Sequence, residues 1–294
     1  MHSVIFDTDI GSDVDDALAL AVLLGSPDVE IVAVTTVYGD TALRARLARR
    51  YAALAGRSLP VHAGAERPLS GADVWWAGHE GTLHDDLKSE TFEAENAVDV
   101  LVRTVAERPG QIDVVAVGPL TNIAEAIQSD PSFADNVRHL WLMGGCFDGT
   151  DNEHNLRSDV TAAEVVFSSG LPITISGLEV TQLLHFGDAE VNRIAAAGDL
   201  GAALERDIQQ WWEFWNETWN VPHDPVTVLS MIRPELFTLS EPGTLSIEVD
   251  DANYGMSSFT PRPDGRARLI TGMEPAAVAG VIVDAVVRGA GTRP

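Results

Sequence analysis

The stretch Asp7-Thr-Asp-Ile-Gly-Ser-Asp-Val-Asp-Asp16 decides how this chain is organised, because it joins two segments of opposite periodicity. The apolar run at residues 3–6 precedes it and predicts a buried strand. Residues 17–24, which are alanine, leucine and valine, follow it and predict a helix. Five carboxylates therefore lie on a tight turn at the carboxyl end of a strand, where open α/β sheets bind their ligands.

The carboxylates of this turn are crowded, and almost nothing close in the sequence neutralises them. Like charges at such spacing repel unless a cation or shared protons relieve them. Asp7, Asp9 and Asp13 alternate with small or apolar residues instead of forming a charged run. This pattern favours an oxygen cage for a hard divalent cation. A solvated acidic loop is the alternative interpretation.

The composition excludes several classes of protein. No stretch of the 294 residues reaches the roughly 18 consecutive apolar residues of a membrane span, and no signal peptide opens the chain, so we expect a cytoplasmic protein. A net charge of −25 argues against nucleic acid and membranes as partners. The single cysteine, Cys146, excludes an intramolecular disulfide.

Strand and helix patterns alternate over the first two-thirds of the chain. Further strands are predicted at residues 30–37, 112–117, 139–143 and 171–175. Such alternation predicts an α/β fold, with an open, mostly parallel sheet flanked by helices. Gly- and Pro-rich short strands in residues 236–270 predict a small C-terminal antiparallel appendage. Because no linker is visible, we expect one domain over residues 1–294.

Polar residues follow several predicted strands and therefore gather at one edge of the sheet. Asp40 follows the second strand, Thr121 follows residues 112–117, and residues 152–155 come after a glycine pair. His223 and Asp224 follow a tryptophan-rich predicted helix. Acids and amides at one edge suit a polyhydroxylated ligand that is held together with a metal ion.

Taken together, these motifs resemble those of the inosine–uridine preferring nucleoside hydrolases over nearly the whole chain. The matching segments, in the order of the family, are Asp-Thr-Asp-x-Gly with the following Asp-Asp-Ala, Val34-Thr-Thr-Val-Tyr-Gly39, Gly118-Pro-Leu-Thr-Asn-Ile-Ala124, Leu142-Met-Gly-Gly145, Glu153-His-Asn155 with Ser158-Asp159, and His223-Asp224-Pro225. The resemblance implies a Rossmann-like nucleoside hydrolase fold and a homo-oligomer, either a dimer or a tetramer. It also implies hydrolysis of the N-glycosidic bond of ribonucleosides to ribose and free base, in purine or pyrimidine salvage.

The resemblance also implies a role for each site residue. Asp9 is expected both to bind Ca²⁺ and to act as general base for a calcium-bound water. The other expected calcium ligands are Asp16, Asp224 and the backbone carbonyl of Thr121. The expected ribose-binding residues are Asp15, Asp40, Asn152, Glu153 and Asn155. The residues expected near the leaving base are the catalytic His223, with His79, Trp75, Trp76, Trp215 and Trp219.

Three departures from the family pattern leave alternatives open. The acidic turn is two residues longer than the compact family form, so Asp13 is an additional acid that competes with Asp15 or Asp16 for a ligand role. Asp40 stands where asparagine is usual, which alters that ribose contact. The loop before Glu153 is short, which weakens the match of Asn152.

The tryptophans and histidines each admit a structural and a functional interpretation. Trp75 and Trp76 lie in a long loop, residues 69–90, where no core explains them. Trp211, Trp215 and Trp219 share the i, i+4, i+8 spacing of one helical face, which packs in the core or stacks on a base. A histidine beside an aspartate, or on a loop, is equally consistent with a structural or solvated role.

Three other functions remain as alternatives. A haloacid-dehalogenase-like phosphatase also begins with Asp-x-Asp after a strand, but it requires Thr or Val where this chain has Gly11, and Lys88 is poorly placed for its lysine. A non-catalytic calcium- or sugar-binding protein explains the acidic loop, although that loop lacks the twelfth-position Glu of an EF-hand. A hydrolase of modified or non-nucleoside ribosides fits the Asp40 change.

Overall fold

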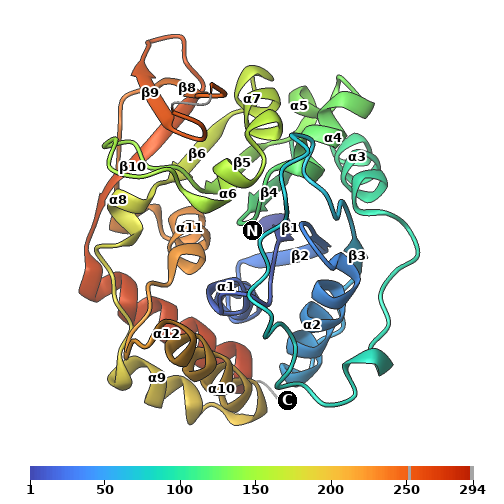
Figure 1. Cartoon of the computed structure of the whole chain (residues 1–294), viewed down its shortest axis with the longest axis vertical. Coiled ribbons are helices and arrows are strands. Elements are labelled where there is room, and N and C mark those ends of the chain that lie inside the picture. Colours follow the sequence, from blue (N-terminus) through green and yellow to red (C-terminus); the bar gives the residue numbers. More distant parts are fainter. Residues whose placement is uncertain (251–252, 292–294) are drawn as a thin grey trace.

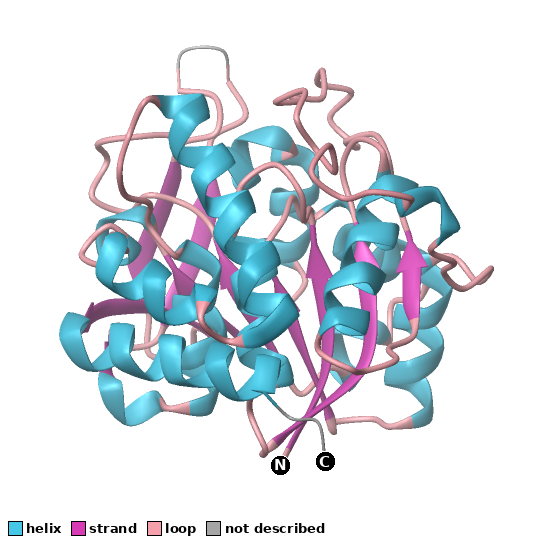
Figure 2. Cartoon of the chain, turned by 90° about the horizontal axis from the view of Figure 1, so that it is seen from below, coloured by secondary structure: helices cyan, strands magenta, loops and turns pink. Residues whose placement is uncertain are grey.

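The computed structural model describes residues 1–250 and 253–291, and in these it shows a ten-stranded sheet between two layers of helices (Figure 1, Figure 2). The strand order is β3-β2-β1-β4-β5-β6-β10-β8-β9, and β7 pairs with β10. The parallel strands are β1 (His2–Thr8), β2 (Val29–Thr36), β3 (Val61–Ala63), β4 (Ile112–Ala116), β5 (His139–Met143), β6 (Ile173–Ser176) and β10 (Ala267–Met273). The antiparallel strands are β7 (Phe237–Leu239), β8 (Gly243–Ile247) and β9 (Ser257–Pro261).

The predicted open, mostly parallel α/β sheet is confirmed, with one difference at its C-terminal edge. The last strand of the predicted appendage, β10, pairs in parallel with β6 and so extends the main sheet. Only β7, β8 and β9 are antiparallel among the described residues. Residues 251–252 of the predicted appendage lie outside the described residues.

Each face of the sheet carries its own hydrophobic core, because neighbouring side chains of a strand point to opposite faces. In β1, Val4 and Phe6 belong to one core and Ile5 to the other. The first core is covered by α1 (Asp15–Leu24), α2 (Thr41–Leu54), α9 (Asp188–Ala195), α10 (Gly198–Trp215), α11 (His223–Ile232) and α12 (Pro275–Gly291). The second is covered by α3 (Ala97–Glu107), α4 (Thr121–Ser129), α5 (Phe133–Asn136) and α7 (Val160–Ser168). The shorter helices are α6 (His154–Ser158), α8 (Leu178–Thr181), η1 (Leu87–Ser89) and η2 (Pro234–Leu236).

The strand order reverses direction between β1 and β4. From β1 the chain moves outward to β2 and β3, and it then returns to place β4 on the other side of β1. The loops that leave β1 and β4 therefore separate at the carboxyl ends of these strands. Doubly wound sheets bind ligands in the crevice that such a reversal opens.

The end of helix α10 is set by the backbone conformation of the residue that follows it. The predicted helix at residues 200–219 ends at Trp215, because Asn216 adopts a left-handed conformation with φ of 55°. As a result, Trp219 lies beyond the helix that carries Trp211 and Trp215. No helix in residues 1–250 and 253–291 combines the length and the apolar character needed to cross a membrane.

Candidate active site

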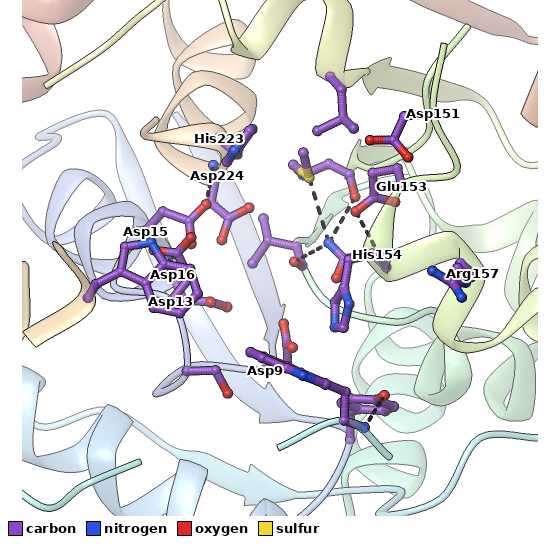
Figure 3. Close-up of a pocket in the computed structure, with 18 of the residues that line it drawn as sticks. Asp9, Asp13, Asp15, Asp16, Asp151, Glu153, His154, Arg157, His223 and Asp224 are labelled. Atoms are coloured by element: carbon purple, nitrogen blue, oxygen red, sulfur yellow. Dashed lines mark hydrogen bonds between the residues drawn. The ribbon is translucent and has the colours of Figure 1, made fainter. Parts of the chain in front are cut away.

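A cavity of about 380 Å³ lies beside the reversal point, where β1, β4 and β5 end (Figure 3). Its acidic lining is Asp9, Asp13, Asp15, Asp16, Asp151, Glu153 and Asp224. Its other polar or aromatic lining is Ser12, Tyr38, Trp75, Asn152, His154, Asn155, Arg157, Trp211, Trp215 and His223, and its apolar lining is Val117, Met143 and Leu178. The volume is within the usual range for small-molecule sites.

Two segments far apart in the sequence supply the densest group of acids. Asp9 follows β1 directly, and Asp15 and Asp16 occupy the first turn of α1. Asp224 occupies the first turn of α11. Carboxylates at these helix N-termini interact favourably with the helix dipole, which explains why aspartates are tolerated there.

Close backbone packing brings the loop after β4 against Asp9. A Cβ atom added at Gly118 would lie 2.8 Å from the Oδ1 atom of Asp9 and 3.0 Å from its backbone nitrogen. Only glycine therefore allows the loop after β4 to approach Asp9 this closely. Val117, which precedes this glycine, lines the cavity as a result.

The aspartates of the two helix starts form a group that fits a divalent cation. Asp15, Asp16 and Asp224 are buried, and one carboxylate oxygen of each lies within 4.8 Å of the other two. Among the described residues, no lysine or arginine forms an ion pair with them. Burial first, and repulsion by neighbouring carboxylates second, raise the pKa of all three well above the usual range. Ca²⁺ and similar cations bind to clustered carboxylate oxygens, and these three carboxylates have no ion-pair partner among the described residues.

Hydrogen bonds fix the orientation of these carboxylates. The hydroxyl of Thr8, the last residue of β1, donates to Oδ1 of Asp16. The backbone N–H of Asp224 donates to Oδ2 of Asp15 at 3.3 Å and so joins the two helix starts. Asp13 lies on the same wall, where burial raises its pKa to about 8 despite a hydrogen bond from the N–H of Val14.

The opposite wall comes from the segment that follows β5 (Figure 3). Glu153 caps α6: its Oε1 atom accepts the N–H of Asn155 at 2.7 Å, and its Oε2 atom accepts two further backbone N–H groups at 2.9 and 3.0 Å. The amide of Asn155 donates to the carbonyl of Val117 at 2.8 Å. The amide of Asn152 donates to the carbonyl of Tyr254 at 3.1 Å. The three predicted ribose-binding side chains on this wall are therefore held in place and line the cavity.

His223 lies beside Asp224 at the start of α11 and lines the cavity (Figure 3). Its Nδ1 atom is 2.7 Å from the hydroxyl oxygen of Thr181. Burial, together with the nearby His185, lowers the pKa of His223 to about 4, so its ring is neutral at pH 7.

Aromatic residues surround the rest of the cavity. Trp75, Trp211 and Trp215 line it, and Trp215 is 56% exposed. Trp212, on the same helix α10, is buried in the core, and its indole N–H donates to Oδ1 of Asn220 at 3.0 Å. The exposed face of α10 thus borders the cavity and the buried face packs in the core.

Five residues predicted at the site lie outside the cavity lining. Trp76 packs over the guanidinium of Arg44, and Trp219 packs against His185 with the two rings tilted by 49°. The His79 ring packs against the acidic turn, with Nε2 2.9 Å from the carbonyl oxygen of Ser12, and lies edge-on to Trp211. Asp40 caps α2 by accepting the N–H of Leu43, so its carboxylate is hydrogen-bonded to the start of that helix and does not line the cavity.

Thr121 is the fifth predicted site residue that lies outside the cavity lining, and its position follows from where α4 begins. As the first residue of α4, it directs its carbonyl along the helix axis, toward the C-terminal end of the helix. Its hydroxyl donates to Asp159 at 2.7 Å, and the same carboxylate accepts the N–H groups of Leu69 and Ser70. Thr121 therefore anchors the long loop of residues 69–90. The residue from this region that lines the cavity is Val117.

Several lining residues did not emerge from the sequence as site residues. His154 and Arg157 lie on α6, and the rings of Tyr38 and Trp75 pack edge-on to His154 at 6.0 and 5.6 Å. His154 lies between Glu153 and Asn155 in the sequence, and both were predicted site residues. This position could have identified His154 as a site residue too. No comparable signal marked Arg157, because its approach to the cavity depends on where α6 begins.

The doubly wound sheet, with an acidic cation-type site at its reversal point, is typical of ligand-binding α/β proteins. Within that class, the family model described as inosine-uridine preferring nucleoside hydrolase matches residues 4–285. The chain therefore belongs to this family of enzymes, and the resemblance read from its motifs is confirmed.

The names of individual similar proteins are consistent with membership of this family. The chain is 34% identical over 278 residues to a protein of Oryza sativa subsp. japonica named probable uridine nucleosidase 2, covering 88% of this chain and 82% of that one. It is 33% identical over 260 residues to the pyrimidine-specific ribonucleoside hydrolase RihA of Citrobacter koseri (strain ATCC BAA-895 / CDC 4225-83 / SGSC4696), covering 81% of each. Among solved structures, a plant nucleoside hydrolase superposes with a TM-score of 0.88 at 26% identity, covering 97% of this chain and 99% of that one.

Proposed function

We propose that this enzyme hydrolyses the N-glycosidic bond of ribonucleosides to ribose and free base, with Asp9 as the general base. The observation that carries the proposal is the opposition of two walls across one cavity of about 380 Å³. One wall holds a cation-type group of aspartates, and the other holds the fixed carboxylate and amides of Glu153 and Asn155. Membership of the nucleoside hydrolase family supports the reaction class.

The metal site is proposed to hold Ca²⁺ through Asp16 and Asp224 of the buried group together with Asp9, whereas Asp15 of that group is proposed to bind ribose. The carbonyl of Val117 takes the place first assigned to Thr121. Val117 lines the cavity and its carbonyl accepts only one hydrogen bond, from Asn155, which leaves a lone pair free among the described residues. When bound, the cation would hold a water molecule and lower its pKa. The residues of this chain supply the remaining chemistry.

The reaction adds water across the C1′–N bond. As this bond breaks, its electron pair moves to the base nitrogen and the ribosyl group gains cationic character. The aspartates around the ring stabilise that positive charge. Asp9 accepts one proton from the attacking water, whose oxygen forms the new bond to C1′, and the departing base gains a proton overall.

Substrate binding divides between the two sides of the cavity. Asp15, Glu153, Asn155 and Asn152 are proposed to accept and donate hydrogen bonds to the ribose hydroxyls, because all four line the cavity. Trp75, with the α10 tryptophans, is proposed to stack on the base. The names of the rice and Citrobacter relatives make uridine the first substrate to test.

A reducing-sugar assay tests this proposal. Uridine and inosine are offered to calcium-loaded and to chelator-treated enzyme, with 2′-deoxyuridine as a control for hydroxyl recognition. We expect ribose release that calcium restores and that falls at least about 100-fold without the 2′-hydroxyl. Full activity after rigorous metal removal, or phosphate release from uridine monophosphate without ribose release, would overturn the proposal.

Assembly is proposed from the family resemblance, and location and partners are proposed from the composition and net charge of the chain. We expect a cytoplasmic homo-oligomer, either a dimer or a tetramer, that acts on nucleosides without nucleic acid or membrane partners. Light scattering coupled to gel filtration separates these states, and a monomer at micromolar concentration would contradict the assembly.

A further inference from the structure

The hydroxyl of Thr181 is the closest polar contact of the His223 ring. Thr181 is the last residue of α8, a short helix that follows β6, and it is fully buried. Its Oγ1 atom lies 2.7 Å from Nδ1 of His223 and 3.5 Å from the carbonyl oxygen of Leu178. Thr181 does not itself line the cavity, so it reaches the site only through the histidine.

The two distances indicate where the single hydroxyl proton points. A hydroxyl donates one hydrogen bond, and the 3.5 Å contact to Leu178 is at the limit of hydrogen bonding. The proton is therefore best placed on the line to His223 Nδ1, which then acts as an acceptor. An Nδ1 atom that accepts a hydrogen bond carries no proton, so the ring proton is on Nε2.

We propose that Thr181 is a positioning residue, which fixes the orientation and tautomer of His223 so that an Nε2–H donor faces the leaving base. This inference rests on the proposed nucleoside hydrolysis. The donated hydrogen bond stabilises negative charge on the base nitrogen as the C1′–N bond breaks. Thr181 makes no contact with ribose or with the aspartates in this role.

The role predicts an effect that depends on the leaving group. Uridine has a poor leaving group and needs the hydrogen bond from His223, whereas p-nitrophenyl β-D-ribofuranoside releases a stable phenolate without it. Both substrates use the same aspartates, the same ribose contacts and the same attacking water. Loss of Thr181 should therefore affect the first substrate and spare the second.

Three variants separate this role from general damage. Thr181→Val keeps the shape and removes the hydroxyl, and Thr181→Ser restores it. Thr227→Val is the matched control, because Thr227 is buried on the same helix as His223 and its hydroxyl has no partner among the described residues. Calcium-loaded full-length enzyme is used throughout, with melting temperatures measured in parallel.

We expect Thr181→Val to lower kcat for uridine at least about 10-fold, with KM changed less than 3-fold and with the p-nitrophenyl riboside rate within 3-fold of wild type. Thr181→Ser should recover most of the uridine rate, and Thr227→Val should keep it. Equal losses on both substrates, or no loss on uridine, would overturn the inference. Inactivity of the wild-type enzyme on both ribosides would instead contradict the proposed function.

Nuclear magnetic resonance of ¹⁵N-histidine-labelled wild type gives a readout that does not depend on the variants folding. We expect the nitrogen shifts of His223 to show a protonated Nε2 and an unprotonated Nδ1. The opposite tautomer would overturn the inference, because Thr181 would then be accepting the hydrogen bond.

Discussion

Replacing Asp224 by Asn should stabilise the metal-free protein and abolish its stabilisation by calcium. The carboxylate oxygens of Asp15, Asp16 and Asp224 lie within 4.8 Å of one another. Two unit charges at that distance repel by about 3.5 kcal/mol at an effective dielectric constant of about 20. Asp224→Asn removes two such pairs, or about 7 kcal/mol if every group is ionised.

Two effects reduce this figure. The raised pKa values of the three carboxyl groups mean that protons already relieve part of the repulsion, and loss of a charge at the start of α11 costs about 0.3–1 kcal/mol. We therefore expect a net gain of about 2–4 kcal/mol at pH 8. For a chain of this size that corresponds to a rise in Tm of about 3–6 °C.

Differential scanning fluorimetry measures this at pH 8, in chelator and in 5 mM CaCl₂. The wild type should melt below Asp224→Asn in chelator and above it in calcium. Glu164→Gln, an exposed change on α7, is the control and should follow the wild type in both buffers. The reasoning is refuted if Asp224→Asn melts below wild type in chelator, or if calcium raises its Tm as much as that of the wild type.

The remaining predictions concern pH, the base and the long loop. Metal-free enzyme should lose stability as pH rises from about 5 to 9, because the folded state keeps protons on Asp13 (pKa about 8) that the unfolded state releases near pH 4; a Tm that is flat or rises would contradict this. Trp75→Ala should raise KM for uridine about 10-fold, while Trp76→Ala leaves it within 2-fold, and equal effects would argue against stacking at Trp75. Asp159→Ala should cost about 3 kcal/mol in urea unfolding, since this fully buried carboxylate holds the 69–90 loop, and a loss below about 1 kcal/mol would show that the loop needs no such anchor.

The arrangement of strands was predictable because each strand carries a continuous apolar run followed by polar residues. Parallel strands place their carboxyl ends at one edge, so Asp9 and the segment around Glu153 were expected to meet, and both line the cavity. The two-residue extension of the acidic turn was visible in the sequence. Its consequence, an additional acid on the same wall at Asp13, required the structure.

Several of the predicted site residues that lie outside the cavity lining are ones whose position depends on where a helix begins or ends. Thr121 and Val117 are four residues apart; Thr121 is the first residue of α4, whereas Val117 precedes that helix and lines the cavity. Asp40 has a suitable side chain, but its position before α2 makes it a helix cap. The i, i+4, i+8 spacing of the tryptophans assumed a helix that extends to residue 219, whereas the left-handed Asn216 ends it.

The central claim is that Asp9 activates water in a nucleoside-binding cavity, and Asp9→Asn tests it most directly. Asparagine keeps the size and oxygen of the side chain but accepts a proton far less readily. Single-turnover ribose release from uridine is measured alongside calorimetric binding of ribose to the calcium-loaded variant. We predict that ribose still binds, while hydrolysis falls at least about 1,000-fold. Hydrolysis within 10-fold of the wild-type rate would contradict the role of Asp9.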